Sequence, residues 1–293
     1  MTYAGWIMIT ASLVGLSCGL IGVFLILRKM AMMADAISHT VLLGIVSAYL
    51  VTQELSGPHM LLGAILAGLL TAFLVQWLQS LQIEHHAAMG IVFTTLFAIG
   101  VILISTAVGK NAHLDVQHAL MGEITFIPFK MISLPLIGDI PEATAMLAFA
   151  CLIVLFAVII FYKEWKITSF DPGLAASLGL PVLLLHYVFM SLVSVTTVAS
   201  FDAVGAIMVV AMLITPAASA YLWTDRLLVM LILSSSFGVI SAIVGYVIAA
   251  WIDTSISGSM AFATGLVFLI SFLLSPKHGL IAGYVRPAKP IEQ

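Results

Sequence analysis

An aspartate and a histidine lie four residues apart where an apolar stretch begins, in the segment RKMAMMADAISHTVLLG. On a helix, Asp35 and His39 would share one face, with Ser38 beside them. A carboxylate and an imidazole on one face form half of a binding site for a divalent transition metal. The carboxylate could instead orient the histidine ring as its hydrogen-bond acceptor. The alternative is a pair that caps the start of a helix, and the spacing alone leaves these interpretations open.

A second acidic residue, Asp202, is isolated in the segment SVTTVASFDAVGAIMVVAMLITPAASA. Between residues 167 and 224, only Asp171 and Asp202 carry a formal charge. An unpaired carboxylate between two apolar runs needs a cation, a proton or water. The alternative is a residue that lies in the connection between two spans. The sequence favours neither interpretation.

A proline interrupts the apolar run that follows Asp202. Pro216 lacks a backbone donor and is expected to kink its helix. The small residues at 217–220 permit close contact with a neighbouring helix. Pro216 is therefore a candidate hinge for a gate, with ordinary helix packing as the alternative.

Several motifs of enzymes are missing from the sequence. There is no GxxxxGK[ST] motif, so the chain by itself has no P-loop for ATP. HExxH and SxxK are missing as well. Cys18 and Cys151 have no CxxC partner, which indicates neither a disulfide framework nor a thiolate metal site. We therefore expect no enzyme and no permanently bound cofactor, and an ATPase, if one is needed, in another chain.

The elements that position these residues follow from the composition. Of the 293 residues, 62% are hydrophobic and only 8% are charged, whereas a soluble domain has about 25% charged residues. This excludes a soluble enzyme, a disordered chain and a basic nucleic-acid binder. The composition therefore predicts that the chain lies in a lipid bilayer. Residues 1–293 are predicted to form a single transmembrane domain.

Nine stretches are free of Asp, Glu, Lys and Arg, and each could hold a spanning helix of about 20 residues. Because these stretches lack the alternation of barrel strands, the predicted fold class is all-α, with 8–9 transmembrane helices. The shortest of them is the one beside Asp35. The nine stretches are 1–27, 36–53, 55–83, 87–109, 143–162, 172–201, 203–224, 227–252 and 254–276.

The basic residues predict an orientation. With nine spans and the N-terminus outside, eight Lys and Arg residues face the cytoplasm and only Lys110 and Lys130 face outward. The C-terminus is then cytoplasmic, with a short basic tail at 277–293. Residues 110–142 form the outer connection, where a short interfacial helix is expected. Residues 163–181 lie on the cytoplasmic side.

Four stretches resemble the membrane permeases of the manganese, zinc and iron ABC importers, the ABC-3 family. The resemblance covers nearly the whole chain, and the four motifs together are specific. The stretches are GVFLILRKMAMMADAISHTVLLGI (22–45), AMGIVFTTLFAIGVILIS (88–105), SFDPGLAASLGLPV (169–182) and SFDAVGAIMVVAMLITPAASA (200–220).

The resemblance implies a fold similar to the type II importer permeases for vitamin B12 and siderophores, in a bacterial plasma membrane. It also implies a homodimer, two cytoplasmic ABC ATPase subunits that use ATP, and a metal-binding protein outside. Mn²⁺, Zn²⁺ or Fe²⁺ would be the transported substrate, with metal contacts from Asp35, His39 and Asp202. By the same resemblance, residues 163–181 would be the coupling segment. The residues in it that would dock on the ATPase are Phe170, Asp171, Pro172, Ala175, Ala176, Leu178 and Gly179.

Carboxylate and imidazole ligands suit Mn²⁺, Fe²⁺ or Zn²⁺ and disfavour Cu(I). Two arrangements of the ligands remain open: Asp35 and His39 share one site with Asp202, or the path has two separate stations. Three other functions also remain open: a permease of similar architecture for haem, siderophore or cobalamin, a secondary transporter that uses Asp202 for a proton or sodium ion, and a membrane scaffold.

Overall fold

The structure is a computed structural model that describes residues 3–52, 58–107, 124–129, 131–134, 138–276 and 279. The basic tail predicted over 277–293 lies outside the described residues, apart from Gly279. Lys110 and Lys130 lie outside them as well, together with most of the predicted outer connection.

Helices make up most of the described chain, and eight of them are long and apolar enough to cross a membrane. A ninth apolar helix, α10, is shorter. Each of the nine charge-free stretches overlaps one of these helices, so the predicted all-α class is confirmed. The nine are α1 (Tyr3–Leu27), α2 (Ala31–Thr52), α3 (Pro58–Ser80), α4 (His85–Ala107), α6 (Glu142–Ile160), α9 (Val182–Val204), α10 (Ala206–Trp223), α11 (Leu227–Ile252) and α12 (Ile256–Leu274).

Two short helices, α7 (Tyr162–Phe170) and α8 (Pro172–Ser177), make up most of the coupling segment. The outer connection contains a 3₁₀ helix, η1 (Ile124–Phe129), and an antiparallel hairpin of β1 (Met131–Leu134) and β2 (Gly138–Pro141). The hairpin was not predicted. Proline at 128, 135 and 141 disfavours a longer α-helix in this stretch, because it lacks the backbone donor that a helix needs.

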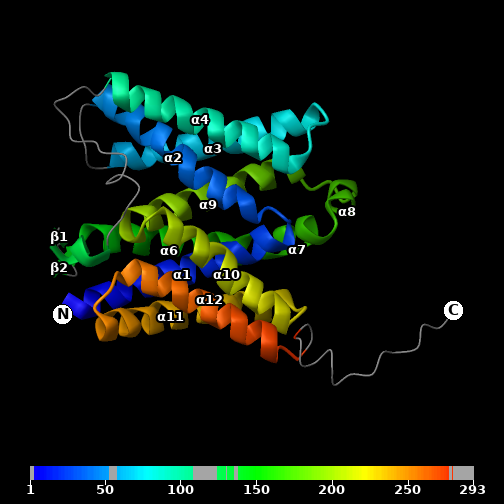
Figure 1. Cartoon of the computed structure of the whole chain (residues 1–293). Coiled ribbons are helices and arrows are strands. Elements are labelled where there is room, and N and C mark those ends of the chain that lie inside the picture. The colour runs from blue at the N-terminus through cyan, green and yellow to red at the C-terminus, as the bar shows by residue number, and fades with distance from the viewer. Residues whose placement is uncertain are drawn as a thin grey trace.

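Helix α1 runs through the middle of the bundle, with α2, α3 and α4 on one side and α11 and α12 on the other (Figure 1). Close contact between α1 and α11 depends on glycine. A Cβ added to Gly15 would lie 2.5 Å from the carbonyl carbon of Gly238. The two backbones therefore touch, as small residues allow between membrane helices.

The two ends of the bundle carry different elements. Helices α7 and α8 lie at the end where α12 finishes, whereas the start of α1 and the hairpin lie at the opposite end (Figure 1). Helices α2 and α9 both run away from the α7–α8 end. This places the coupling segment and the hairpin at opposite ends of the bundle, because the single helix α6 separates them.

Candidate functional site

Helix α2 presents the predicted carboxylate–imidazole pair. His39 Nε2 lies 3.6 Å from Asp35 Oδ1, and the two side chains are 37% and 40% exposed. Because α2 begins at Ala31, Asp35 lies one turn inside the helix, which does not fit the interpretation of a capping pair. The hydroxyl of Ser38 donates to the backbone oxygen of Asp35 at 2.7 Å, so it is directed at its own helix.

Two aromatic side chains from α4 hold the ring of His39. The Phe93 ring stacks on it with centroids 5.7 Å apart, and the Phe97 ring meets it edge-on at the same distance. These residues restrict the imidazole to orientations between two apolar surfaces. The sequence analysis did not single them out, although two phenylalanines four residues apart on one helix face were a usable signal.

The rest of α2 is fixed against α3. The hydroxyls of Thr40 and Thr71 are 2.7 Å apart and share a buried hydrogen bond. A Cβ added to Gly44 would lie 2.3 Å from the carbonyl oxygen of Gly63. Helix α2 therefore packs closely against α3 on one side, while the side that carries Asp35 and His39 stays partly exposed and is called the open flank of α2.

Asp202 lies near the end of α9, and its side chain is outside the described part of the structure. Ile37 of α2 and Ser194 of α9 both meet Gly68 of α3, so these two residues lie at one level of the bundle. Asp202 lies eight residues after Ser194 on α9, whereas His39 lies only two residues after Ile37 on α2. At 1.5 Å per residue, the two levels differ by about 9 Å along the bundle. Among the described residues, no three His, Cys, Asp or Glu side chains gather as a metal site.

The coupling segment is shaped by its two ends. Asp171 caps α8 by accepting a hydrogen bond from the Leu174 backbone N–H at 2.9 Å, and Pro172 fills the first position of the helix. After Leu178, Gly179 has a φ of 77°, a conformation that favours glycine.

Helix α8 points most of its side chains away from the protein. Ala175 is buried, whereas Ala176 and Pro172 are exposed. The apolar side chains of Phe170, Leu174 and Leu178 are 59%, 51% and 62% exposed. This short helix therefore presents an exposed apolar surface at one end of the bundle.

A basic residue connects the coupling segment to the start of α2. The Nε of Arg28 donates to Ser169 Oγ at 3.0 Å, and its Nη2 donates to Thr168 Oγ1 at 3.0 Å. The guanidinium carbon lies 4.5 Å from the centroid of the Phe189 ring in α9. Burial lowers the pKa of Arg28 from its ordinary value to about 10, so the group stays protonated at neutral pH.

Pro216 lies inside α10, which continues as a helix on both sides of it. One turn away, Leu213 is packed tightly on α1, because a Cβ added to Gly22 would lie 1.9 Å from the Leu213 carbonyl oxygen. The structure thus supplies the close helix packing that was the alternative for this proline. The hinge stays a prediction.

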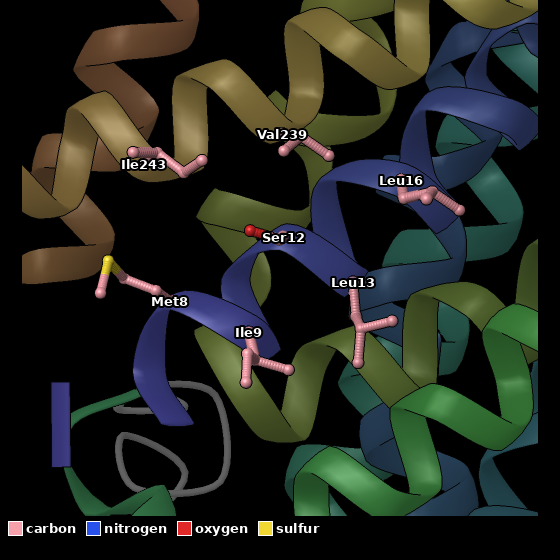
Figure 2. Close-up of a pocket in the computed structure, with 7 residues that line it drawn as sticks. All are labelled: Met8, Ile9, Ser12, Leu13, Leu16, Val239 and Ile243. Atoms are coloured by element: carbon pink, nitrogen blue, oxygen red, sulfur yellow. The ribbon is translucent and has the colours of Figure 1, made fainter. Parts of the chain in front are cut away.

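One hollow between α1 and α11 has a volume of about 440 Å³ (Figure 2). Its lining has no ionisable group and therefore no strong ligand for a divalent cation. The lining residues are Met8, Ile9, Ser12, Leu13, Leu16, Val239 and Ile243.

Comparisons with known proteins agree on one class. The family model of the ABC 3 transport family matches residues 2–275. The manganese transport system membrane protein MntD of Bacillus subtilis is 56% identical over 286 residues, which is 98% of this chain and 97% of that protein. The zinc transport system membrane protein TroD of Treponema pallidum is 41% identical over 94% of this chain and 75% of its own length.

Solved structures share the fold. PsaBC from Streptococcus pneumoniae, solved in complex with Fab, aligns with a TM-score of 0.80 and 33% identity, covering 97% of this chain and 96% of that chain. An inward-facing putative metal-chelate type ABC transporter aligns with a TM-score of 0.62 and 18% identity over 91% of this chain and 84% of the other, a likeness in fold alone. The bundle and these relatives define a membrane-spanning permease. The chain belongs to the ABC 3 transport family.

Proposed function

We propose that this chain is the permease of an ATP-driven bacterial importer of divalent transition-metal ions. The single observation that carries the proposal is the Asp35–His39 pair, because a carboxylate and an imidazole on one face of a membrane helix are costly unless they serve an ion or a partner. The relatives named for manganese and zinc transport support the same class of cargo.

The ion path is proposed to form where two copies of the chain meet. Asp35 and His39 supply two ligands, fewer than the four to six that these metals usually take. Both side chains are more than a third exposed in one chain, so a second copy could bring its own pair to the same ion. Asp202, about 9 Å further along the bundle, would be a second station near the outer end.

Coupling to ATP hydrolysis is assigned to α8. Its exposed apolar side chains suit insertion into a groove of an ATPase subunit, and its Asp171 cap and Gly179 turn fix its length. Two ATPase copies would serve a homodimer of permeases. A binding protein would deliver the ion at the opposite end, where the N-terminus lies outside under the predicted orientation.

Manganese is the metal we place first. Over the whole path, with Asp202 counted, the chain supplies two carboxylates for each imidazole, a donor set that leans towards Mn²⁺ or Fe²⁺ rather than Zn²⁺. The 56% identity with a protein named for manganese transport points the same way. A chelated or organic cargo would need a wide path without ion ligands, and a secondary transporter would work without any ATPase.

The test is metal accumulation in cells that express the whole transporter, measured by elemental mass spectrometry. His39→Ala and Asp202→Ala are compared with the native permease at equal membrane abundance. His86→Ala is the matched control, because His86 is exposed in the first turn of α4. Manganese uptake is expected to fall in the first two variants only. Unchanged uptake in both would contradict the ligand assignment and favour a chelated cargo, and uptake without the ATPase would favour a secondary transporter.

A further inference from the structure

Arg28 follows α1 directly, and a short hydrogen-bonded turn joins it to α2. The backbone N–H of Arg28 donates to the Phe24 oxygen at 3.0 Å, and that of Met30 donates to the Leu25 oxygen at 2.8 Å. Lys29 has a φ of 58°, which closes the turn in the left-handed region. Because the turn is short and its donors are satisfied, a displacement of Arg28 also displaces the start of α2.

The side chain of Arg28 contacts the coupling segment through directional bonds. Its two hydroxyl acceptors, Thr168 and Ser169, come immediately before Phe170, the first exposed residue of the proposed docking surface. In the described part of the chain Arg28 forms no salt bridge. The guanidinium uses its planar fork to bind two hydroxyls at once, which a lysine cannot reproduce.

The apolar attachment of α7 lies beside this polar one. Trp165 is fully buried, and its ring meets those of Phe24 and Phe189 edge-on, with centroids 5.5 Å apart in both pairs. These contacts attach α7 to α1 and α9. The Arg28 bonds are different in kind, because they reach the residue that leads directly into α2.

We propose that Arg28 is a positioning residue that transmits movement of the coupling segment to α2, and so to Asp35 and His39. The inference rests on the proposed function, because it assumes that an ATPase moves the coupling segment. Asp35 lies seven residues after Arg28 and one turn into α2, so a shift at the turn reaches the carboxylate along one short rigid path. The hydroxyl partners can exchange without separating a buried ion pair, which suits a contact that is remade in each cycle.

The experiment uses the purified transporter, with its ATPase and binding protein, in proteoliposomes. Manganese uptake and ATP hydrolysis are measured together for the native complex and for Arg28→Met. We expect Arg28→Met to keep its ATPase and to hydrolyse ATP, while the manganese transported per ATP falls about tenfold, the size expected for losing charge-assisted hydrogen bonds. A merely structural role would instead lower ATPase copurification and hydrolysis together, and that result would overturn the proposal.

Lys29→Met is the matched control, because Lys29 is the neighbouring basic residue and is exposed. It is expected to match the native complex. The combined change Thr168→Val and Ser169→Ala removes the two hydroxyl acceptors and leaves Arg28 in place. It should also lower the manganese transported per ATP. If Arg28→Met does not reach the membrane, Arg28→Lys is measured instead. This variant retains the positive charge without the planar guanidinium, and the same decrease in manganese transported per ATP is expected.

Different results would contradict the proposed function and the inference about Arg28. Native proteoliposomes that take up no manganese, zinc or ferrous ion would overturn the proposed function and this inference with it. If native proteoliposomes take up manganese normally and Arg28→Met transports as much manganese per ATP as they do, the inference alone would be overturned. An equal fall in Lys29→Met would do the same, because it would assign the effect to basic charge at the membrane surface.

Discussion

The imidazole of His39 and the phenyl ring of Phe93 are stacked, with centroids 5.7 Å apart and planes 28° apart. The stack joins α2 to α4, and the Phe97 ring of α4 meets the imidazole edge-on. A histidine that is held in this way keeps one ring orientation towards its open flank. The aromatic pair therefore reduces the ordering that metal binding would otherwise require.

Replacing Phe93 by alanine is expected to weaken metal capture. The manganese concentration that gives half-maximal uptake should rise roughly threefold to tenfold, in line with the energy of an aromatic pair. Concentration-dependent uptake in cells with equal permease abundance measures it. Ile91→Ala, an exposed position on the same helix, is the control and should not change the half-saturation value.

Replacing Asp35 by asparagine separates charge from shape. The amide keeps the shape of the side chain but supplies no negative charge to a cation. Manganese uptake is expected to fall about tenfold or more, the cost of one charge-assisted contact. Glu84→Gln makes the same chemical change at an exposed turn and should leave uptake intact. Equal effects of the two changes would contradict a role of Asp35 as a metal ligand.

Replacing Gly179 by valine should disturb the docking helix. A β-branched residue at a φ of 77° costs about 1–2 kcal/mol, so the chain that leaves α8 is expected to shift. Copurification of the ATPase should decrease while membrane insertion persists, and Phe170→Ala should have the same effect. Gly265→Val, at a position with open space around it, is the control. Normal copurification in both Gly179→Val and Phe170→Ala would show that α8 is not the docking element.

Replacing Gly15 by alanine should loosen the bundle. The new methyl group would lie 2.5 Å from the backbone of Gly238, so α1 and α11 must separate. Overpacking of this kind costs about 1–3 kcal/mol, and the melting temperature of the purified permease in detergent is expected to drop. Gly90→Ala, with no heavy atom near the added carbon, should melt as the native protein does.

Much of the fold could be predicted from the sequence because lipid imposes one rule on every span. Backbone groups in a bilayer must bond internally, so charge-free runs become helices. The pairing of Asp35 with His39 followed from the helical repeat in the same way. The pairing of β1 with β2 could not be predicted, because the rule for spans does not apply to a stretch interrupted by charged residues and prolines.

Contacts between distant helices were beyond the sequence analysis. Arg28 served only as a basic residue in the prediction of orientation, although its partners Thr168 and Ser169 lie about 140 residues away. Phe93 and Phe97 share one helix face, but the sequence does not reveal that this face meets His39 of α2. Such relationships depend on how helices pack, and composition within one span does not encode that.

The open flank of α2 has a consequence for the cell. In a lone chain, Asp35 and His39 are partly exposed at the side of the bundle rather than enclosed within it. Under the proposed function, a permease that has not yet met its second copy has an unfinished route for ions. Surplus or newly inserted chains would then not leak metal across the bilayer, and the cell could tolerate unequal synthesis of the transporter's components.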